Sequence, residues 1–320
     1  MSEQQKPTDR LVYTGDLEPV IDRLCAAYDV GIPASSSVIE VGYEDCNVVV
    51  ETSQDKYLAK MFAKTRTAEE IERYTTTMQK VVDAGVHHPE LLTTSSGEVV
   101  YTDSGITLVL MRFIEGKTFF ELDQAPDAEE RKAVLEQASR VNGIDYKPTY
   151  LFDSWAIPNI RAMFDKVRQF VEPDDLKLVE QAMARYEAIP VDDLPHAFVH
   201  GDFTKTNVLK GNDGKVYILD FSVANWYPRI QELAVIAANL LHDGSDSSSL
   251  EDRCNLVAGE YSRFNALTAE ERQHLPDYAL AGIAMEFMGA HQEKHINGND
   301  TDETDYWLKL GRAGLRKALK

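Results

Sequence analysis

Polar side chains that could do chemistry gather around two short apolar runs near residue 210. Asp202 and Asn207 come just before the first run, and Asp220 comes directly after the second. Asp213-Gly214 between the runs is a strong hairpin signal, because both residues tolerate the positive φ of a type I′ turn. With those two residues as the turn, Asn207 is predicted to face Asp220, with Cβ atoms roughly 5 Å apart.

An amide oxygen beside a carboxylate suits a hard cation such as Mg²⁺, which proteins bind together with substrate phosphates and water. Asp202 would then remain to accept a proton or to orient a hydroxyl nucleophile. Each of these residue types alone commonly caps a turn or ends a strand. The three together, within an otherwise apolar hairpin, favour a metal site with an adjacent base.

The elements that must position these residues change character along the chain. Residues 38–114 read mostly as β-branched strands separated by polar turns, at 38–42, 47–52, 56–62, 98–102 and 107–114. One helix interrupts them, beginning at the capping-box sequence Thr67-Ala-Glu-Glu70 and ending at Gly85.

After residue 115 the apolar spacing becomes helical, as at 128–141, 160–170 and 176–186. A strand-rich segment at 197–221, which carries the polar cluster, interrupts the helices once. We therefore expect two domains, residues 1–115 and residues 116–320.

The composition excludes several classes of protein. Of the 320 residues 43% are hydrophobic, and 33 basic against 53 acidic residues give a formal net charge of −20. The apolar fraction is typical of a chain with a packed core. A surface this acidic repels phosphate backbones, so we expect no nucleic-acid partner.

The cysteines and the N-terminus favour a cytoplasmic location. The three cysteines are odd in number and have no C-x-x-C spacing, which is typical of reduced thiols. The first residues lack a basic and then apolar signal segment, and no run approaches the roughly 18 apolar residues of a membrane span. We expect a soluble protein that has no membrane partner.

The polar cluster also resembles a known family. His200-Gly-Asp-Phe-Thr-Lys-Thr-Asn207, followed by Ile218-Leu-Asp-Phe221, resembles the catalytic loop and metal-binding segment of the aminoglycoside phosphotransferase and choline kinase superfamily. The resemblance implies an α+β, bilobal protein-kinase-like fold, in which an antiparallel β-sheet N-lobe with one main helix and a mostly helical C-lobe clamp the nucleotide. It implies that Asp202 is the catalytic base, that Asn207 and Asp220 hold Mg²⁺, and that ATP is the phosphoryl donor.

The N-terminal strands fit the same resemblance. Lys60 shares a predicted strand face with apolar neighbours, and a lysine there needs an anionic partner. The resemblance supplies the α- and β-phosphates of ATP as that partner. It also places Gly42 in a loop that covers the phosphates, and the backbone of Arg112 and Ile114 at the adenine.

Two acidic positions test the resemblance. The helix glutamate that pairs with the strand lysine in such kinases would align near Tyr74, which has no carboxylate. Glu72 is the substitute that we favour, and Glu70 or neither residue are the alternatives, because Glu70 also fits the capping box. Glu232, which precedes Leu-Ala, resembles the acid that braces the catalytic loop in this family.

The sequence therefore predicts an ATP- and Mg²⁺-dependent enzyme that phosphorylates a hydroxyl group of a small molecule. A nucleotide-binding pseudokinase is the alternative, because the helix glutamate is missing. The acceptor stays open among amino alcohols, aminoglycosides, homoserine and sugar-like compounds, and so does the oligomeric state. A cationic acceptor is favoured by the acidic residues of the C-terminal half, which include Glu251, Asp252, Glu260, Glu286, Glu293 and the acids of residues 300–305.

Overall fold

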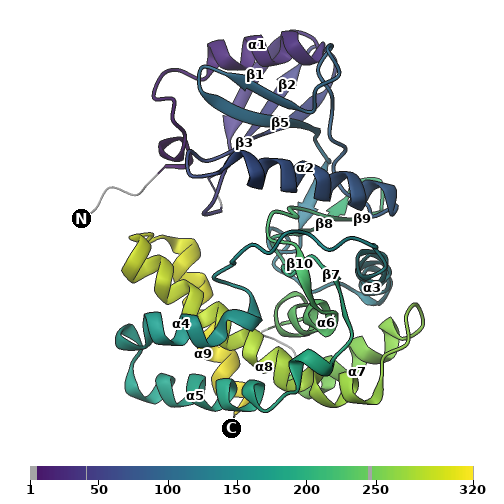
Figure 1. Cartoon of the computed structure of the whole chain (residues 1–320), viewed down its shortest axis with the longest axis vertical. Helices are drawn as coiled ribbons and strands as arrows, with labels where there is room; N and C mark the ends of the chain where they lie inside the picture. Colours follow the sequence, from purple (N-terminus) through teal and green to yellow (C-terminus); the bar gives the residue numbers. More distant parts are fainter. Residues whose placement is uncertain (1–5, 41, 244–246, 320) are drawn as a thin grey trace. The chain divides into compact units, whose positions relative to one another are not determined.

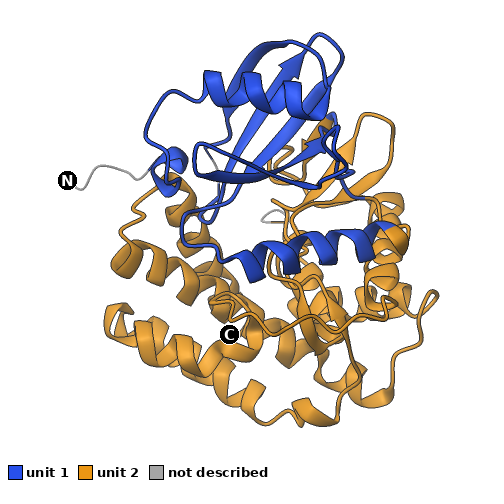
Figure 2. Ribbon diagram, turned by 45° about the horizontal axis from the view of Figure 1, so that its top comes forward, with its two compact units in different colours: residues 1, 3–82, 88–115 blue, residues 2, 83–87, 116–320 orange. Residues whose placement is uncertain are grey.

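The computed structural model describes residues 6–40, 42–243 and 247–319. The chain divides into two compact units, coloured separately in Figure 2. We call residues 3–82 and 88–115 the sheet unit, and residues 83–87 and 116–320 the helical unit.

The sheet unit is built on five antiparallel strands in the order β1-β2-β3-β5-β4. Helix α1 lies over this sheet, as Figure 1 shows. The bounds of the strands are β1 Pro33–Val38, β2 Cys46–Thr52, β3 Lys56–Met61, β4 Val100–Asp103 and β5 Ile106–Arg112, and those of the helices are η1 Pro7–Arg10, α1 Glu18–Tyr28 and α2 Ala68–Asp83.

The core of the sheet unit forms because alternate strand residues point to one face. One hydrophobic cluster joins the sheet to α1. It contains Leu24 of that helix, Val48 and Val50 of β2, and Ala59 and Met61 of β3. This packing agrees with the prediction of antiparallel strands with an apolar face.

The start of the sheet unit differs from the sequence prediction. We expected the first strand at 38–42, of which residue 41 lies outside the described residues, but β1 ends at Val38, and helix α1 was not predicted. The Ser-rich β1 is an edge strand whose side chains are mostly exposed, and it is held by main-chain pairing such as Ser36 with Val50. An exposed edge strand has no apolar alternation for a sequence pattern to reveal.

The helical unit contains most of the helices and two small antiparallel sheets, β10-β7 and β6-β8-β9. Its strands are β6 Gly116–Thr118, β7 His196–Val199, β8 Val208–Gly211, β9 Val216–Ile218 and β10 Asn225–Pro228. Its longer helices are α3 Ala128–Asn142, α4 Ile160–Val167, α5 Pro173–Glu187, α6 Ile230–Val235, α7 Leu250–Tyr261, α8 Ala269–Gln292 and α9 Asp302–Ala318. Two π-helical turns, η5 Ile236–Leu240 and η6 Glu293–Asn297, continue α6 and α8.

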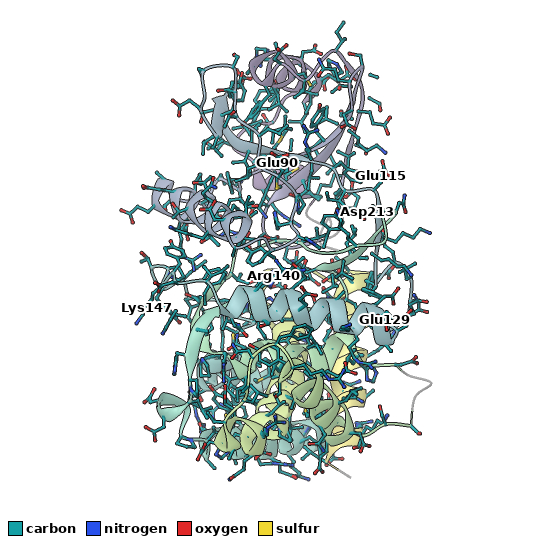
Figure 3. All side chains as sticks on the ribbon, turned by 90° about the vertical axis from the view of Figure 1, so that its right-hand side faces the viewer. Glu90, Glu115, Glu129, Arg140, Lys147 and Asp213 are labelled. Atoms are coloured by element: carbon teal, nitrogen blue, oxygen red, sulfur yellow. The ribbon has the colours of Figure 1, made fainter. Side chains whose placement is uncertain are left out.

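Charged side chains near its ends stabilise α3. Asp127 caps the first turn by accepting hydrogen bonds from the Glu129 and Glu130 backbones. Figure 3 shows Glu129 and Arg140 near opposite ends of this helix. An acidic first turn and a basic last turn both complement the helix dipole.

The β8–β9 hairpin corrects the predicted register. Val208 pairs with Ile218, so Asn207 lies opposite Leu219 and one position away from the expected Asp220. The cause is a three-residue loop in place of the predicted two-residue turn: the Lys215 carbonyl accepts the Gly211 N–H at 2.8 Å, and Gly214 takes φ +81°. A type I turn followed by a left-handed glycine is the usual form of such a loop.

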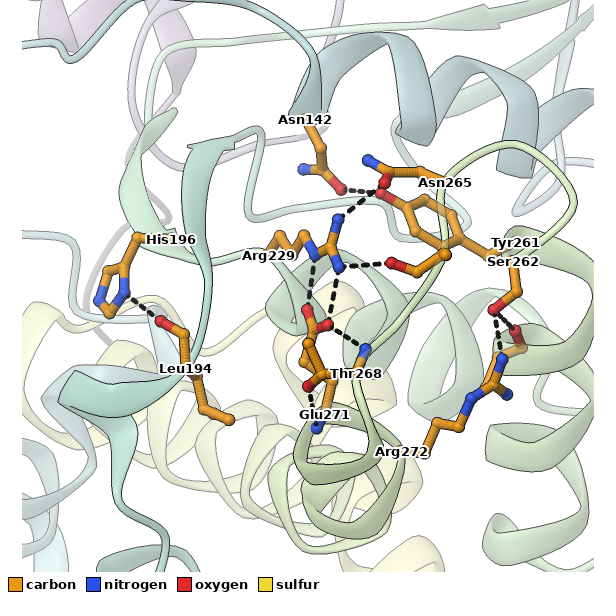
Figure 4. Close-up of polar contacts among 12 residues, drawn as sticks. Asn142, Leu194, His196, Arg229, Tyr261, Ser262, Asn265, Thr268, Glu271 and Arg272 are labelled. Atoms are coloured by element: carbon orange, nitrogen blue, oxygen red, sulfur yellow. Dashed lines mark hydrogen bonds and ion pairs between the residues drawn. The ribbon is translucent and has the colours of Figure 1, made fainter.

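A buried ion pair anchors α8 beside the start of α6. Arg229 contacts both carboxylate oxygens of Glu271, at 2.6 and 2.7 Å, and Glu271 is fully buried (Figure 4). Arg229 also donates to the Asn265 side chain at 2.8 Å. The two helices that flank the candidate site are thus fixed to each other.

The described residues include no helix that is both long enough and apolar enough to span a bilayer. Cys25, Cys46 and Cys254 are buried free thiols, as predicted. Burial raises the pKa of the Cys254 thiol to about 12, so this thiol stays protonated at neutral pH.

Candidate active site

The loop of residues 200–207 connects β7 to β8 and carries the predicted base. Glu232 of α6 holds the start of this loop, because its carboxylate accepts the His200 N–H at 2.5 Å and the Gly201 N–H at 3.0 Å. Glu232 is fully buried, and burial raises the pKa of its carboxyl to about 8. The structure thus agrees with the bracing role predicted for Glu232.

His200 ties the same loop to Leu219, the residue that precedes Asp220. Its Nδ1 accepts the Asp202 N–H at 3.0 Å, and its Nε2 lies 2.8 Å from the Leu219 carbonyl. Because Nδ1 is an acceptor, the proton sits on Nε2, which donates to Leu219. Burial lowers the pKa of His200 to about 4, so the neutral ring persists at physiological pH.

Asp202 and Asn207 are in direct contact at the two ends of the loop. Asn207 Nδ2 donates to Asp202 Oδ2 at 2.6 Å and to the Asp202 carbonyl at 3.3 Å. The amide nitrogen is therefore directed at Asp202, and Asn207 Oδ1 is the atom of this side chain that can bind a cation.

Asp220 is positioned by its backbone and by Ser222. It takes φ +56°, a left-handed conformation that costs free energy for a residue other than glycine and is common at functional sites. Ser222 donates to Asp220 Oδ1 through its backbone N–H, at 3.1 Å, and through its hydroxyl. The Asn207 carbonyl accepts the Leu219 N–H at 2.8 Å. This hydrogen bond links the main chain of Asn207 to the residue directly before Asp220.

These donors fit a hard divalent cation. An amide oxygen and a carboxylate are ligands that Mg²⁺ prefers, and Mg²⁺ sites usually draw their other ligands from phosphates and water. In the described part of the chain, no group of three or more His, Cys, Asp or Glu side chains could hold a metal by itself. A cation bound here would therefore need further ligands from a phosphate-bearing substrate.

In the sheet unit, Lys60 of β3 is a buried lysine, 3% exposed. Its Nζ lies 3.3 Å from Asp45 Oδ2 and 5.3 Å from the centre of the Tyr74 ring. Lys60 is therefore shielded from solvent, and the nearby carboxylate comes from the segment between β1 and β2.

Of the alternatives left open for Lys60, the structure shows neither Glu72 nor Glu70 as its partner. Glu72 is exposed on α2 and makes no ion pair with Lys60. Glu70 completes the capping box, because its carboxylate accepts the Thr67 N–H at 2.7 Å. Asp45 was missed because its closeness to Lys60 depends on strand pairing, in which Cys46 lies opposite Met61.

Three other predicted nucleotide contacts lie in the sheet unit. Gly42 has φ +101°, and its carbonyl accepts a hydrogen bond from Arg10 at 2.8 Å. Arg112 ends β5, and Ile114 follows it on the same edge, because alternate residues of an extended chain point their amides to one side. In the described chain no group accepts the Ile114 N–H.

Asn239 and Glu286 lie beside the loop, and neither was assigned an individual role in the site from the sequence. Asn239 lies in the π-helical turn, with its Oδ1 accepting the Lys205 N–H at 3.0 Å and its Nδ2 donating to Glu286 at 2.7 Å. Both residues interrupt long apolar helical runs, and an isolated polar residue in such a run was the signal that could have found them.

Comparisons with known proteins identify the family of the chain. A family model described as the phosphotransferase enzyme family matches residues 36–267. A homoserine kinase of Rhizobium meliloti (strain 1021) is 25% identical over 283 residues, which cover 86% of this chain and 84% of that protein.

Solved structures confirm the predicted α+β, protein-kinase-like fold. An amicoumacin kinase in complex with AMP-PNP and Ca²⁺ has a TM-score of 0.68 and 12% identity, covering 94% of this chain and 93% of that one. A choline kinase from Streptococcus pneumoniae has a TM-score of 0.66 and 12% identity, covering 94% and 99%. The match to the family model over most of the length, with this fold and the motif around Asp202, shows that the chain belongs to the phosphotransferase enzyme family.

Proposed function

We propose that this protein transfers the γ-phosphoryl group of ATP, with Mg²⁺, to a hydroxyl group of a small molecule. The observation that carries the proposal is the contact of Asp202 with Asn207 in a loop that Glu232 and His200 hold rigidly. Phosphoryl transfer depends mainly on positioning and charge neutralisation, which a preorganised loop supplies.

Each residue of the site has a stated role in this proposal. Asp202 orients the acceptor hydroxyl and takes its proton as the new P–O bond forms and the bond to ADP breaks. Asn207 Oδ1 and the Asp220 carboxylate hold Mg²⁺, which would neutralise charge on the phosphates. The products are ADP and a phosphate monoester.

The sheet unit supplies the proposed nucleotide contacts. Lys60 binds the α- and β-phosphates, and the Gly42 backbone lies against the phosphates, where a side chain would obstruct close approach. The Arg112 carbonyl and the Ile114 N–H bind the adenine edge. Glu72 is excluded from this set, because it is exposed and makes no ion pair with Lys60.

Homoserine is the first acceptor to test. The homoserine kinase of Rhizobium meliloti aligns over 86% of this chain. The antibiotic and choline kinases share only the fold, at 12% identity, so their acceptors carry less weight.

A nucleotide-binding protein without turnover has no support from the site. The alternative arose because α2 lacks a glutamate for Lys60, but Asp45 supplies a carboxylate at 3.3 Å.

The role of Asp202 is tested by ADP release in the presence of ATP, Mg²⁺ and homoserine. We expect Asp202→Asn to lower kcat at least about 10²-fold, because removal of a general base costs about that much, while Mg·ATP binding by calorimetry is retained. Asp213→Asn at the exposed hairpin tip is the matched control and should keep wild-type turnover. Undiminished turnover in Asp202→Asn would refute the role of Asp202.

The metal ligands are tested by thermal shift. ATP with Mg²⁺ should stabilise the wild-type protein more than ATP alone, because a ligand that binds only the folded state raises its stability. Asn207→Ala and Asp220→Asn should each remove the extra stabilisation from Mg²⁺. An unchanged Mg²⁺ effect in both variants would show that the metal binds elsewhere.

A further inference from the structure

The helical unit carries many acidic residues, and the structure shows which of them already have a partner. Glu260 pairs with Arg131 at 2.8 Å, and the Asp300 and Asp305 carboxylates both contact Lys294, also at 2.8 Å. Two other acids are held by neutral donors: Asp252 accepts the Ser249 N–H in the capping box of α7, and Glu293 accepts from Asn297 and Asn299. These interactions account for most of the acids that made a cationic acceptor attractive in the sequence.

Glu286 of α8 differs from these residues. It is half-buried, its Oε1 accepts from Asn239, and it makes no ion pair with any cation in the part of the chain that the structure describes. A partly buried carboxylate without a cation is unfavourable, because one hydrogen bond from a neutral amide does not replace the hydration that burial removes.

Asn239 fixes the position of Glu286 relative to the catalytic loop. Asn239 is 2% exposed and uses both ends of its amide, one for the Lys205 N–H and one for Glu286. It lies in the π-helical turn after α6, and such turns occur frequently at functional sites. The chain of hydrogen bonds therefore runs from the loop that carries Asp202 through Asn239 to Glu286.

Electrostatics and aromatic packing support the same location. Burial, opposed by the hydrogen bond from Asn239 and assisted by the charge of Asp202, raises the pKa of Glu286 to about 7. Tyr306 of α9 is also close enough for Glu286 to raise its pKa, after the effect of burial, and its ring packs edge-on against Phe120 at 5.1 Å. Two carboxylates beside an aromatic ring make a region that attracts a cation.

We infer that Glu286 binds the ammonium group of the acceptor whose hydroxyl Asp202 orients, so that Glu286 determines specificity for amine-bearing alcohols. This inference rests on the proposed function. The bound ammonium supplies the positive charge that no described residue places beside Glu286, and Asn239 keeps the carboxylate oriented before the acceptor arrives.

The test compares acceptors that differ only in the amine. Homoserine is paired with 4-hydroxybutyrate, and 1-amino-2-propanol with 2-propanol, and kcat/KM for ADP release is measured for each. In the wild-type protein the amine-bearing member should be preferred. In Glu286→Gln, which keeps the oxygen that Asn239 contacts, we expect that preference to fall about 10- to 100-fold, the usual effect of a hydrogen bond to a charged group.

The controls separate recognition from folding. Glu251→Gln removes an exposed glutamate of α7 and should leave the preference unchanged. If Glu286→Gln does not fold, Glu286→Asp keeps the charge but withdraws it by one methylene, and the preference should then fall to an intermediate value.

Three outcomes would overturn the inference. An equal loss of kcat/KM for both members of a pair in the Glu286 variants would assign Glu286 a structural role only. An unchanged preference would remove Glu286 from the acceptor site. If the wild-type protein releases ADP with an amine-free alcohol but with neither amine-bearing member, this inference alone fails; release with no hydroxyl acceptor at all would refute the proposed function as well.

Discussion

Asp45 Oδ2 lies 3.3 Å from Lys60 Nζ, and the two side chains are 1% and 4% exposed. Asp45 also accepts the Ala63 N–H at 3.0 Å, and Arg66 lies within 3.4 Å of its carboxylate. The segment before β2 therefore supplies the negative charge that the sequence had led us to seek on α2. The burial of Lys60 and Asp45 together makes their interaction sensitive to the loss of either partner.

A double-mutant cycle on Lys60 and Asp45 should reveal this coupling. We expect Asp45→Asn alone to lower the free energy of unfolding by about 3 kcal/mol, because it leaves a buried ammonium poorly compensated. Lys60→Met combined with Asp45→Asn should cost less than the sum of the two single changes, by at least about 1 kcal/mol. Urea unfolding measures each value, and strictly additive changes would show that the two residues do not interact.

The brace formed by Glu232 should be detectable in turnover. Glu232→Gln replaces one acceptor oxygen by an amide group that faces a backbone N–H, so the 200–207 loop loses one of its two hydrogen bonds to Glu232. We expect kcat to fall on the order of 10²-fold, as a displacement of about 1 Å in an active site costs, with little change in the KM for ATP. Glu232→Asp keeps both carboxyl oxygens, set back by one methylene, and should lose less. Wild-type kcat in Glu232→Gln would contradict the bracing role.

The left-handed turn at Gly214 and the helical Gly259 should respond oppositely to alanine. Gly214 has φ +81° in the β8–β9 loop, so Gly214→Ala should destabilise the protein by about 1 kcal/mol. Gly259 is exposed within α7 with open space around it, so Gly259→Ala should stabilise it by about 0.5–1 kcal/mol. Urea unfolding of both variants tests this, and effects of the same sign would mean that the turn does not have this form.

The buried, neutral His291 makes the free energy of unfolding depend on pH in the acid range. It is 5% exposed, neither ring nitrogen has a hydrogen-bond partner within the described residues, and burial lowers its pKa from 6.5 to about 4. The folded state therefore binds fewer protons than the unfolded state between these values. The contribution of neutral His291 to the free energy of unfolding is fully present above pH 6.5. It is lost as the pH falls toward 4, by about 2 kcal/mol at pH 5.

The variant His291→Leu isolates this contribution. It removes the titrating group and the two unpaired nitrogens, so its free energy of unfolding should fall less than that of the wild type between pH 7.5 and pH 5. Urea unfolding at the two pH values measures the difference. An identical fall in both proteins would show that His291 is not held neutral.

The sequence alone was informative wherever the signal is local. The capping box at Thr67–Glu70 and the order of Asp202, Asn207 and Asp220 are patterns within a few residues, and each reflects a local conformational preference or a short chemical motif. These patterns were enough to predict the α+β fold class, the family and a set of candidate catalytic residues.

Other features depend on contacts between segments far apart in the chain. The hairpin register shifted by one residue because Gly214 extends the loop, and a local turn signal does not settle loop length when two turn types share the same residues. The Ser-rich strand β1 forms because its main chain pairs with that of β2. The side chains of β1 have no pattern that would predict a strand.

The sequence by itself determined which acids and amides are available for chemistry, whereas only the tertiary structure decided which of them meet. Asp45 rather than Glu72 lies beside Lys60, and Glu286 alone among the considered acids has a link through Asn239 to the catalytic loop. The physical reason is that a charge acts on its neighbours in space, and those neighbours are set by strand pairing and helix packing.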